Sequence, residues 1–353
     1  MNSNFLKIPN GETNNTKRLL LFVLSDKSVI GQVTNVFDAP YKYIDVKNEQ
    51  YTGSKKFNFS RFIIIDARPD PSKIGLYLQK NLIQQREVHR LDYKNGITTD
   101  VTNFLLNYYK HAFAETGDSI LIVIRKAWVS QYDTTLSLGN RFIGSGTIFL
   151  TKLKLELYLK NTEYYYPISR VDTSFITTVK RSVNDFGYEI TDAIINSCDY
   201  LFSLNTPSIL KKKKYTLEQI NQFNSKSFDH PILHTAKYKK GVYLTFTEFL
   251  NNDPSLDYTD INKNKYGDVL YLNDGNGKEY ASNRFWGYSD GESPYIISGK
   301  KFFKLVRIHN TFEFYGIKNL RERFNYSGDV VQKRKPALDM CIYQVDIETG
   351  ETY

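Results

Sequence analysis

The sequence has 353 residues, with 47 Lys and Arg against 38 Asp and Glu, which gives a formal net charge of +9. Hydrophobic residues make up 41% and aromatic residues 15% of the chain, a composition that excludes disordered and collagen-like or mucin-like proteins. No run reaches the roughly 18 apolar residues of a transmembrane helix. The 27 Tyr and 23 Phe favour a strand-rich folded protein, and the length suggests about two domains.

Residues 1–31 have the pattern of a degenerate export leader. Lys17 and Arg18 precede the apolar run Leu19 to Leu24, and Gly31 follows as a small residue. These are the parts of a secretory signal, so we expect export to the periplasm or outer envelope, with cleavage near Gly31. The six-residue run is shorter than usual, which leaves an alternative: a cytoplasmic protein with a disordered start and a buried strand at Leu19 to Leu24.

Residues 32–209 predict a mixed sheet with two helices. Apolar or alternating patterns indicate strands at Phe62 to Asp66, Ile74 to Leu78, Ser119 to Ile124 with Trp128 to Tyr132, Thr147 to Leu159, and Tyr164 to Ile176. Apolar residues at helical spacing indicate one helix after the N-cap candidates Thr98 to Asp100 and a second between Val179 and Leu201. A sheet covered by both helices on one face satisfies this order.

Residues 210–240 predict a basic linker. Between Lys211 and Lys240 there are eight lysines against Glu218 and Asp229, and a solvated linker is the ordinary explanation of such a run. The alternative is a polyanion-binding surface carried by the consecutive Lys211, Lys212, Lys213 and Lys214. Nucleic acid is not the expected partner, because no nucleic-acid-binding signature accompanies these lysines.

Residues 241–353 predict a β-rich domain. Thr245 to Glu248 has the pattern of a capping box and predicts a short helix. After it, short strands separated by glycine-containing turns indicate an antiparallel meander. The last strand, Cys341 to Glu348, alternates apolar and polar residues. The predicted fold class is therefore α+β.

The residue types that carry chemistry are sparse. Cys198 and Cys341 are too few for a disulfide framework or a four-thiolate zinc site, and we expect two buried thiols or a single bridge. His230 and His234 have the spacing of helical zinc ligands, but Pro231 and the absence of a glutamate between them argue against a metal. We expect no catalytic residues, no metal and no cofactor.

The segment Trp286-Gly287-Tyr288-Ser289-Asp290-Gly291 is the most distinctive in the second half. It predicts a core tryptophan and a hairpin, closed by Asp290 and Gly291, between Tyr288 and Tyr295. Trp286, Tyr288 and Asp290 are also the candidate binding residues of this half. In the enzyme alternative, Trp286, Asp290 and Glu292 would belong to an interdomain site.

Two resemblances cover most of the chain. Ile65-Asp66-Ala67-Arg68-Pro69-Asp70, followed by Lys73-Ile74-Gly75, resembles a strand end of YajG-type envelope lipoproteins, which implies a small α/β sheet domain up to about Leu204. The lipid-anchor cysteine of those proteins is missing here. Lys240 to Tyr243 and Trp286 to Gly291 resemble a module of uncharacterised Bacteroidetes envelope or secreted proteins, which implies no particular reaction.

These observations lead to one main hypothesis, a non-enzymatic binding or structural protein of the bacterial cell envelope. Its partner would be a protein or a glycan, bound through sheet edges and aromatic surface. The alternatives are an enzyme of unrecognised class with an interdomain site, and a polyanion-binding protein acting through the segment from Lys211 to Lys240.

Overall fold

The computed structural model describes residues 39–80, 86–138, 141–177, 182–264, 267–273, 276, 279–282, 284–316 and 341–353. All of these belong to one compact unit, Ala39–Tyr353. The expected leader, residues 1–31, lies outside the described residues. In the described part of the chain, no helix is both long and apolar enough to span a membrane.

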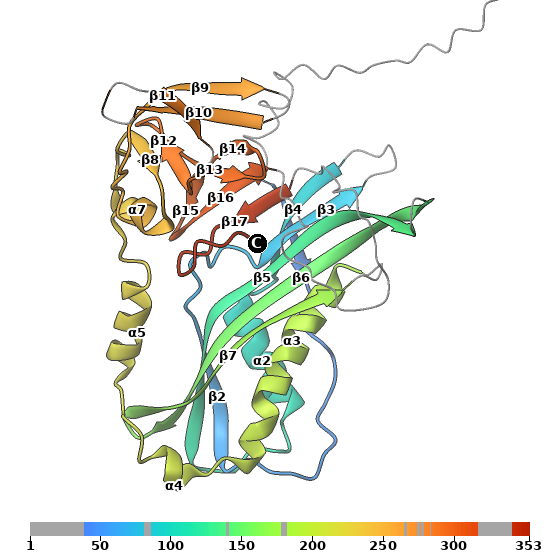
Figure 1. The fold of residues 1–353 in the computed structure, drawn as a ribbon. Coiled ribbons are helices and arrows are strands. Elements are labelled where there is room, and N and C mark those ends of the chain that lie inside the picture. The colour runs from blue at the N-terminus through green and yellow to red at the C-terminus, as the bar shows by residue number, and fades with distance from the viewer. Residues whose placement is uncertain are drawn as a thin grey trace, which may run out of the picture. The chain divides into compact units, whose positions relative to one another are not determined.

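The first half is built on a mixed sheet, as predicted (Figure 1). Its seven strands are β1 (Tyr41–Ile44), β2 (Phe59–Asp66), β3 (Gly75–Lys80), β4 (Arg86–Tyr93), β5 (Asp118–Leu138), β6 (Arg141–Asn161) and β7 (Tyr164–Thr177). The order is β1-β4-β3-β5-β6-β7, with β2 also paired to β5. The β2–β5 and β1–β4 pairs are parallel, whereas β5, β6 and β7 run antiparallel to one another. The sequence patterns had indicated neither β1 nor β4.

Both predicted helices cover one face of this sheet, as expected. They are α2 (Ile97–Tyr108) and α3 (Asn184–Cys198), followed by the 3-10 helix η1 (Asp199–Ser203) and by α4 (Thr206–Ile209). Their apolar stripes share one core with alternate residues of β5 and β6, such as Ile122 and Leu155. Helix α2 begins before the predicted cap, because Gly96 is the N-cap and Asp100 instead accepts hydrogen bonds from Asn95.

Gly187 lets α3 lie close to the chain that follows β1. A Cβ atom at this position would lie 2.1 Å from the carbonyl oxygen of Asp45. Only glycine fits such a close approach of helix to backbone, which explains a residue that is otherwise unfavourable inside a helix.

A β-bulge interrupts β5 at Arg125. Ile120, Ile122 and Ile124 face the two helices, and beyond the shift in register Ala127 faces them as well. The extra residue in β5 shifts the register by one, so the side chains of Arg125 and Lys126 both point to the sheet face opposite the two helices. That face therefore receives two consecutive cations in the middle of the sheet.

The second half is β-rich and antiparallel, as predicted. Its elements are α5 (Leu217–Lys226), α6 (Pro231–His234), β8 (Gly241–Tyr243), α7 (Phe246–Leu250), β9 (Tyr258–Asn264), β10 (Gly267–Asn273), β11 (Glu279–Ser282), β12 (Gly287–Ser289), β13 (Pro294–Ser298), β14 (Lys301–Lys304), β15 (Val306–Ile308), β16 (Thr311–Gly316) and β17 (Cys341–Gln344). They form three small sheets, β11-β10-β9, β14-β13-β12-β8 and β15-β16-β17. The segment expected to be a basic linker contains α5, whose Ile220 is fully buried against the first sheet.

The last predicted strand is shorter than expected. It ends at Gln344, and the chain then turns, with the amides of Thr349 and Gly350 donating to the carbonyl of Asp346. The acidic residues after it meet cations of the sheet face opposite α2 and α3: Asp346 pairs with Lys126, and Glu348 pairs with Lys154. Lys154 is only 4% exposed. The polar residues that alternate with the leucines of β6 look solvent-facing in the sequence, but at Lys154 the segment after β17 covers them.

Candidate functional site

The described residues enclose a groove of about 560 Å³. We call it the polar groove, and it is lined by Ile65, Asp66, Ala67, Arg68, Asn221, Asn224, Ser225, Lys226, Phe228, Asp229, His234 and Asn310. These residues come from three places in the sequence: the end of β2, the segment from α5 to α6, and the turn between β15 and β16. The fold therefore assembles this site from segments that are far apart in the chain.

An ion pair forms the floor of the polar groove. Arg68 donates from Nε and Nη2 to the two carboxylate oxygens of Asp66, both at 2.8 Å. Its Nη1 donates to the carbonyl of Lys73 at 2.7 Å, and Nη2 also reaches the carbonyl of Pro71. All three nitrogens of the guanidinium thus donate hydrogen bonds inside the protein, and they hold the loop after β2 in place.

Helix α5 forms one wall. Thr216 caps it through a capping box with Gln219, and Ile220 packs against Leu121 and Val123 of β5. One turn later, Asn224 faces the groove, with Asn221, Ser225 and Lys226 around it. None of these residues was predicted from the sequence to be in a site, although Thr216 and Gln219 have the capping-box spacing that marks a helix start.

The third side carries a histidine and an asparagine. His234 Nε2 lies 3.3 Å from Asp229 Oδ1, so the histidine contacts a carboxylate and not its neighbour His230, which is the N-cap of α6. The backbone amide of Asn310 donates to the carbonyl of Pro69 at 3.1 Å. Among the described residues, no group of three or more His, Cys, Asp or Glu is placed to hold a metal ion.

A buried charge cluster joins the loop after β2 to β16. Lys73 Nζ lies 2.7 Å from Asp70 and 3.1 Å from Glu313, and His309 Nδ1 lies 3.0 Å from Asp70. Burial raises the pKa of Glu313, although Lys73 opposes the shift. Burial alone would lower the pKa of Lys73, but Glu313 and Asp70 raise it overall. His309 of this cluster directly precedes Asn310, whose backbone amide contacts the same loop.

The structure places Trp286, Tyr288 and Asp290 outside the polar groove. Trp286 is half-buried on Phe249, with ring centres 4.2 Å apart, and Tyr288 is buried. The predicted hairpin is confirmed, because Tyr288 pairs with Tyr295 and Gly291 has a φ of 96°.

Asp290 is exposed and holds this hairpin turn. Its Oδ1 accepts the amides of Glu292 and Ser293, and its Oδ2 accepts the hydroxyl of Tyr295. Burial alone would raise the pKa of Asp290, but these hydrogen bonds lower it overall. The carboxylate is thereby held ionised in a turn, which is a structural role.

The four consecutive lysines also lie away from the polar groove. Lys214 Nζ lies 3.6 Å from the ring centre of Tyr164, and Lys213 Nζ lies 5.3 Å from that of Tyr215. Lys212 Nζ donates to the carbonyls of Pro167 and Ile168. All four side chains, including Lys211, are exposed, and the contacts of Lys212 and Lys214 tie the run to β7.

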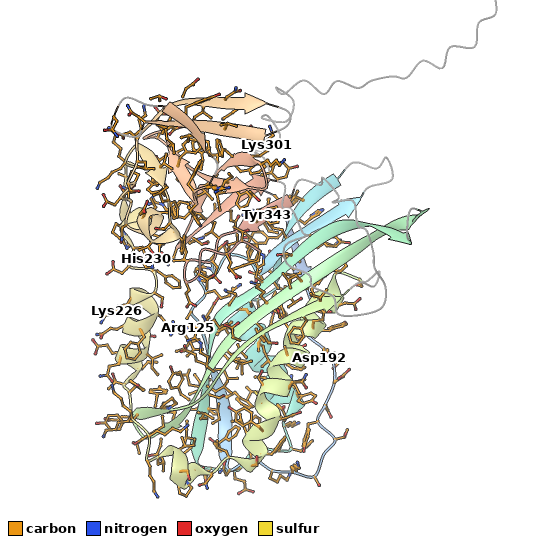
Figure 2. All side chains as sticks on the ribbon, in the orientation of Figure 1. Arg125, Asp192, Lys226, His230, Lys301 and Tyr343 are labelled. Carbon is orange, nitrogen blue, oxygen red and sulfur yellow. The ribbon has the colours of Figure 1, made fainter. Side chains whose placement is uncertain are left out.

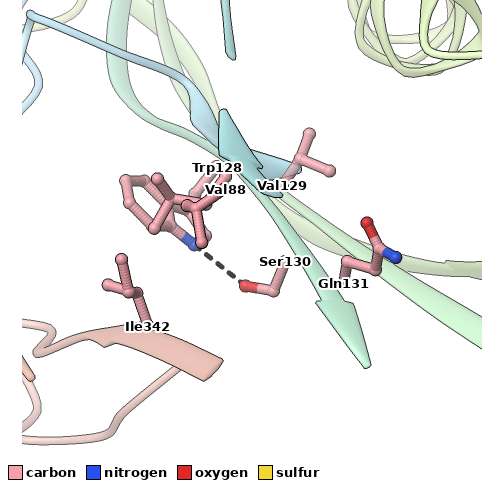
Figure 3. A pocket seen from close by; sticks show the side chains of 7 residues that line it. Val88, Trp128, Val129, Ser130, Gln131 and Ile342 are labelled. Carbon is pink, nitrogen blue, oxygen red and sulfur yellow. Dashed lines mark hydrogen bonds between the residues drawn. The ribbon is translucent and has the colours of Figure 1, made fainter. Parts of the chain in front are cut away.

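A second hollow lies under β17 and is too small for a ligand. Its volume is about 10 Å³, the space of a single water molecule. Trp128 Nε1 donates there to Ser130 Oγ at 2.9 Å (Figure 3). Cys198 is likewise a structural residue, a free buried thiol whose pKa is raised by burial.

No family model matches the chain, and no curated protein matches it. Among solved structures, the chain is similar to a crystal structure of protein XCC0632 from Xanthomonas campestris, which carries the family description DUF330. The sequence identity is 6% and the TM-score 0.28, over 46% of this chain and 95% of that chain. A likeness at this level supports no argument about fold or function.

Proposed function

We propose that the chain is a non-enzymatic binding protein of the bacterial cell envelope, and that its polar groove holds a short glycan. The supporting observation is the chemistry of the lining. Nine of the twelve lining residues are polar or charged, whereas small-molecule pockets are usually lined mainly by apolar side chains. A ligand that hydrogen-bonds along its whole length suits such a lining.

The individual side chains favour a saccharide. Asn221 and Asn310 each carry an amide that both donates and accepts, which matches the hydroxyls of a sugar ring. Phe228 adds an aromatic ring beside them, on which the apolar face of a sugar would pack. The volume of about 560 Å³ falls within the range of roughly 300–1,000 Å³ that is typical of ligand sites.

The charged groups of the lining support binding more than catalysis. Asp66 is engaged by Arg68, and Asp229 contacts His234. A general acid or base needs a proton position open to its substrate, and the Asp66 carboxylate instead receives two N–H groups of Arg68 on its two oxygens. The enzyme alternative therefore has less support in this groove than the binding proposal.

A glycan array probed with the purified protein tests the proposal, with immobilised peptides as the competing class. We expect binding to oligosaccharides, and a variant carrying Asn221→Ala and Asn310→Ala should bind at least about ten-fold more weakly. Asn262→Ala, an exposed asparagine on β9, is the matched control and should bind normally. Binding to peptides alone, or glycan binding that the groove variant leaves unchanged, contradicts the proposal.

The envelope location is part of the same proposal and has its own test. It rests on the leader pattern from Lys17 to Gly31 in the sequence. Cell fractionation, followed by a mass measurement of the mature N-terminus, should find the protein in the envelope and cleaved near Gly31. A full-length protein confined to the cytosol contradicts this part alone.

A further inference from the structure

Arg125 has unused hydrogen-bonding capacity inside the protein. Its side chain is only 10% exposed, and Nη2 donates to Glu156 Oε2 at 3.0 Å. Nε and Nη1 are buried and have no hydrogen-bond partner among the described residues. Buried donors of a charged group are rarely left unpaired, because desolvation without a partner is costly.

The bulge in β5 places Arg125 on the sheet face that α5 covers. Figure 2 shows Arg125 on the sheet side of that helix, and Lys226 at the helix end. Ala67, which lines the polar groove, donates its backbone amide to the carbonyl of Ile124, the residue before Arg125. Arg125 therefore follows a residue that is bonded to the groove lining, although Arg125 is not itself a lining residue.

Asn224 provides the matching observation from the helix. It lines the polar groove, and its Oδ1 is buried without a hydrogen-bond partner in the described part of the chain. Unpaired donors thus occur on the sheet face that α5 covers, and an unpaired acceptor occurs on α5 itself. Because Asn224 Oδ1 accepts no hydrogen bond, turning this side chain breaks no hydrogen bond to that oxygen.

We infer that the glycan in the polar groove carries a carboxylate, which Arg125 binds when the Asn224 side chain turns aside. The inference rests on the proposed function. A carboxylate supplies only acceptors, and its bonds to a guanidinium are charge-assisted. Glu156 Oε2 accepts hydrogen bonds from both Arg125 Nη2 and the Tyr158 hydroxyl. Nε and Nη1 of Arg125 are therefore left for a second acceptor.

The charge at the rim agrees with this ligand class. Lys226 lines the groove, and it has no ion-pair partner among the described residues. The carboxylates of the groove, Asp66 and Asp229, lie instead against Arg68 and His234. An uncompensated lysine at the mouth attracts an anion over roughly one Debye length, about 8 Å at physiological salt.

Matched pairs of oligosaccharides test the inference. The probes are trisaccharides that end in glucuronic or galacturonic acid, together with the same trisaccharides ending in glucose or galactose, titrated by calorimetry. We expect each acid to bind at least about ten-fold more tightly than its neutral counterpart. Arg125→Gln should reduce the acids to the affinity of the neutral sugars and leave the neutral sugars unchanged.

Two further variants keep the test independent of stability. Arg61→Gln, at an exposed arginine of β2, is the control and should keep the preference for acids. Asn224→Ala removes the side chain that we infer to turn aside, and it should strengthen binding of the acids only. If the acid and the neutral sugar of each pair bind equally well, the carboxylate inference is wrong and glycan binding stands. If neither sugar binds, the carboxylate inference and the proposed glycan binding are both wrong.

Discussion

Lys73 and Glu313 form an ion pair of 3.1 Å, although they belong to opposite halves of the sequence, and neither side chain is more than 5% exposed. Asp70 completes the cluster from the same loop as Lys73. The pair connects the loop after β2 to β16, and Asn310 of the polar groove contacts the same loop, because its backbone amide donates to the carbonyl of Pro69. The consequences of the ion pair for stability are measurable.

Lys73→Met should destabilise the protein by about 3–5 kcal/mol, because it leaves Asp70 and Glu313 buried without their cation. Urea unfolding, followed by tyrosine and tryptophan fluorescence, measures the loss. Lys239→Met is the matched control, since Lys239 and Asp253 form an exposed pair that contributes about 0–1 kcal/mol. A Lys73→Met protein as stable as wild type would show that the ion pairs of Lys73 with Asp70 and Glu313 do not stabilise the fold.

Asp92 should make stability depend on pH in the mildly acid range. Burial, only partly opposed by Arg68, raises its pKa to about 6, whereas the unfolded chain has a value of about 4. The folded state therefore holds the proton of Asp92 more tightly than the unfolded chain does. The contribution of Asp92 to the free energy of unfolding is fully present below about pH 4 and is lost as the pH rises through about 6.

Asp92→Asn tests this sign. The variant should be more stable than wild type at pH 8, by on the order of 1 kcal/mol after allowance for solvent screening. The difference between the two proteins should shrink below about pH 4, because Asp92 is then protonated in both states. Thermal melts from pH 3 to 8 give the comparison, and parallel curves for the two proteins would show that Asp92 titrates normally.

Gly187→Ala should destabilise the protein in spite of its better helix propensity. The new Cβ would meet the Asp45 carbonyl, and overpacking costs about 1–3 kcal/mol, more than the gain of about 1 kcal/mol from helix propensity. Asn196→Ala, at an exposed position of the same helix, should instead be neutral or slightly stabilising. Thermal melts of both variants decide whether the close approach is real.

Trp286→Ala should cost about 2–3 kcal/mol, below the 3–5 kcal/mol of a fully buried aromatic residue, because the ring is half-buried on Phe249. Asp290→Asn should change stability little, since asparagine suits the same turn position. If Trp286→Ala melted like wild type, the tryptophan would belong to a surface that contacts a partner.

Much of the fold was predictable because local patterns determine it. Alternation along β6 and the apolar run of β2 gave strands, and the stripe from Phe186 to Leu201 gave α3. In the sequence, the bulge at Arg125 appears only as a gap between the predicted strand segments Ser119 to Ile124 and Trp128 to Tyr132. Alternation alone does not say which face of the sheet each segment turns toward the helices. The covered lysines of β6 were not predictable, because their burial depends on acidic residues that follow β17.

The polar groove was less accessible to sequence reasoning. Asp66 and Arg68 drew attention through the resemblance carried by the segment from Ile65 to Asp70, and no residue of the groove was among the candidate binding residues. The helix that carries Asn221 and Asn224 was hidden in a lysine-rich stretch, where composition outweighed the capping signal of Thr216. Asn310 joins the site through tertiary contacts alone.

The bulge also determines which changes in length β5 tolerates. Deleting either Arg125 or Lys126 would remove the extra residue and restore strict alternation, so every later residue of the strand would keep its face. Ala127 and Val129 would still face α2 and α3, and Trp128 and Ser130 would still face the opposite side. A one-residue deletion within a regular stretch of the strand would instead move the residues after it to the opposite face.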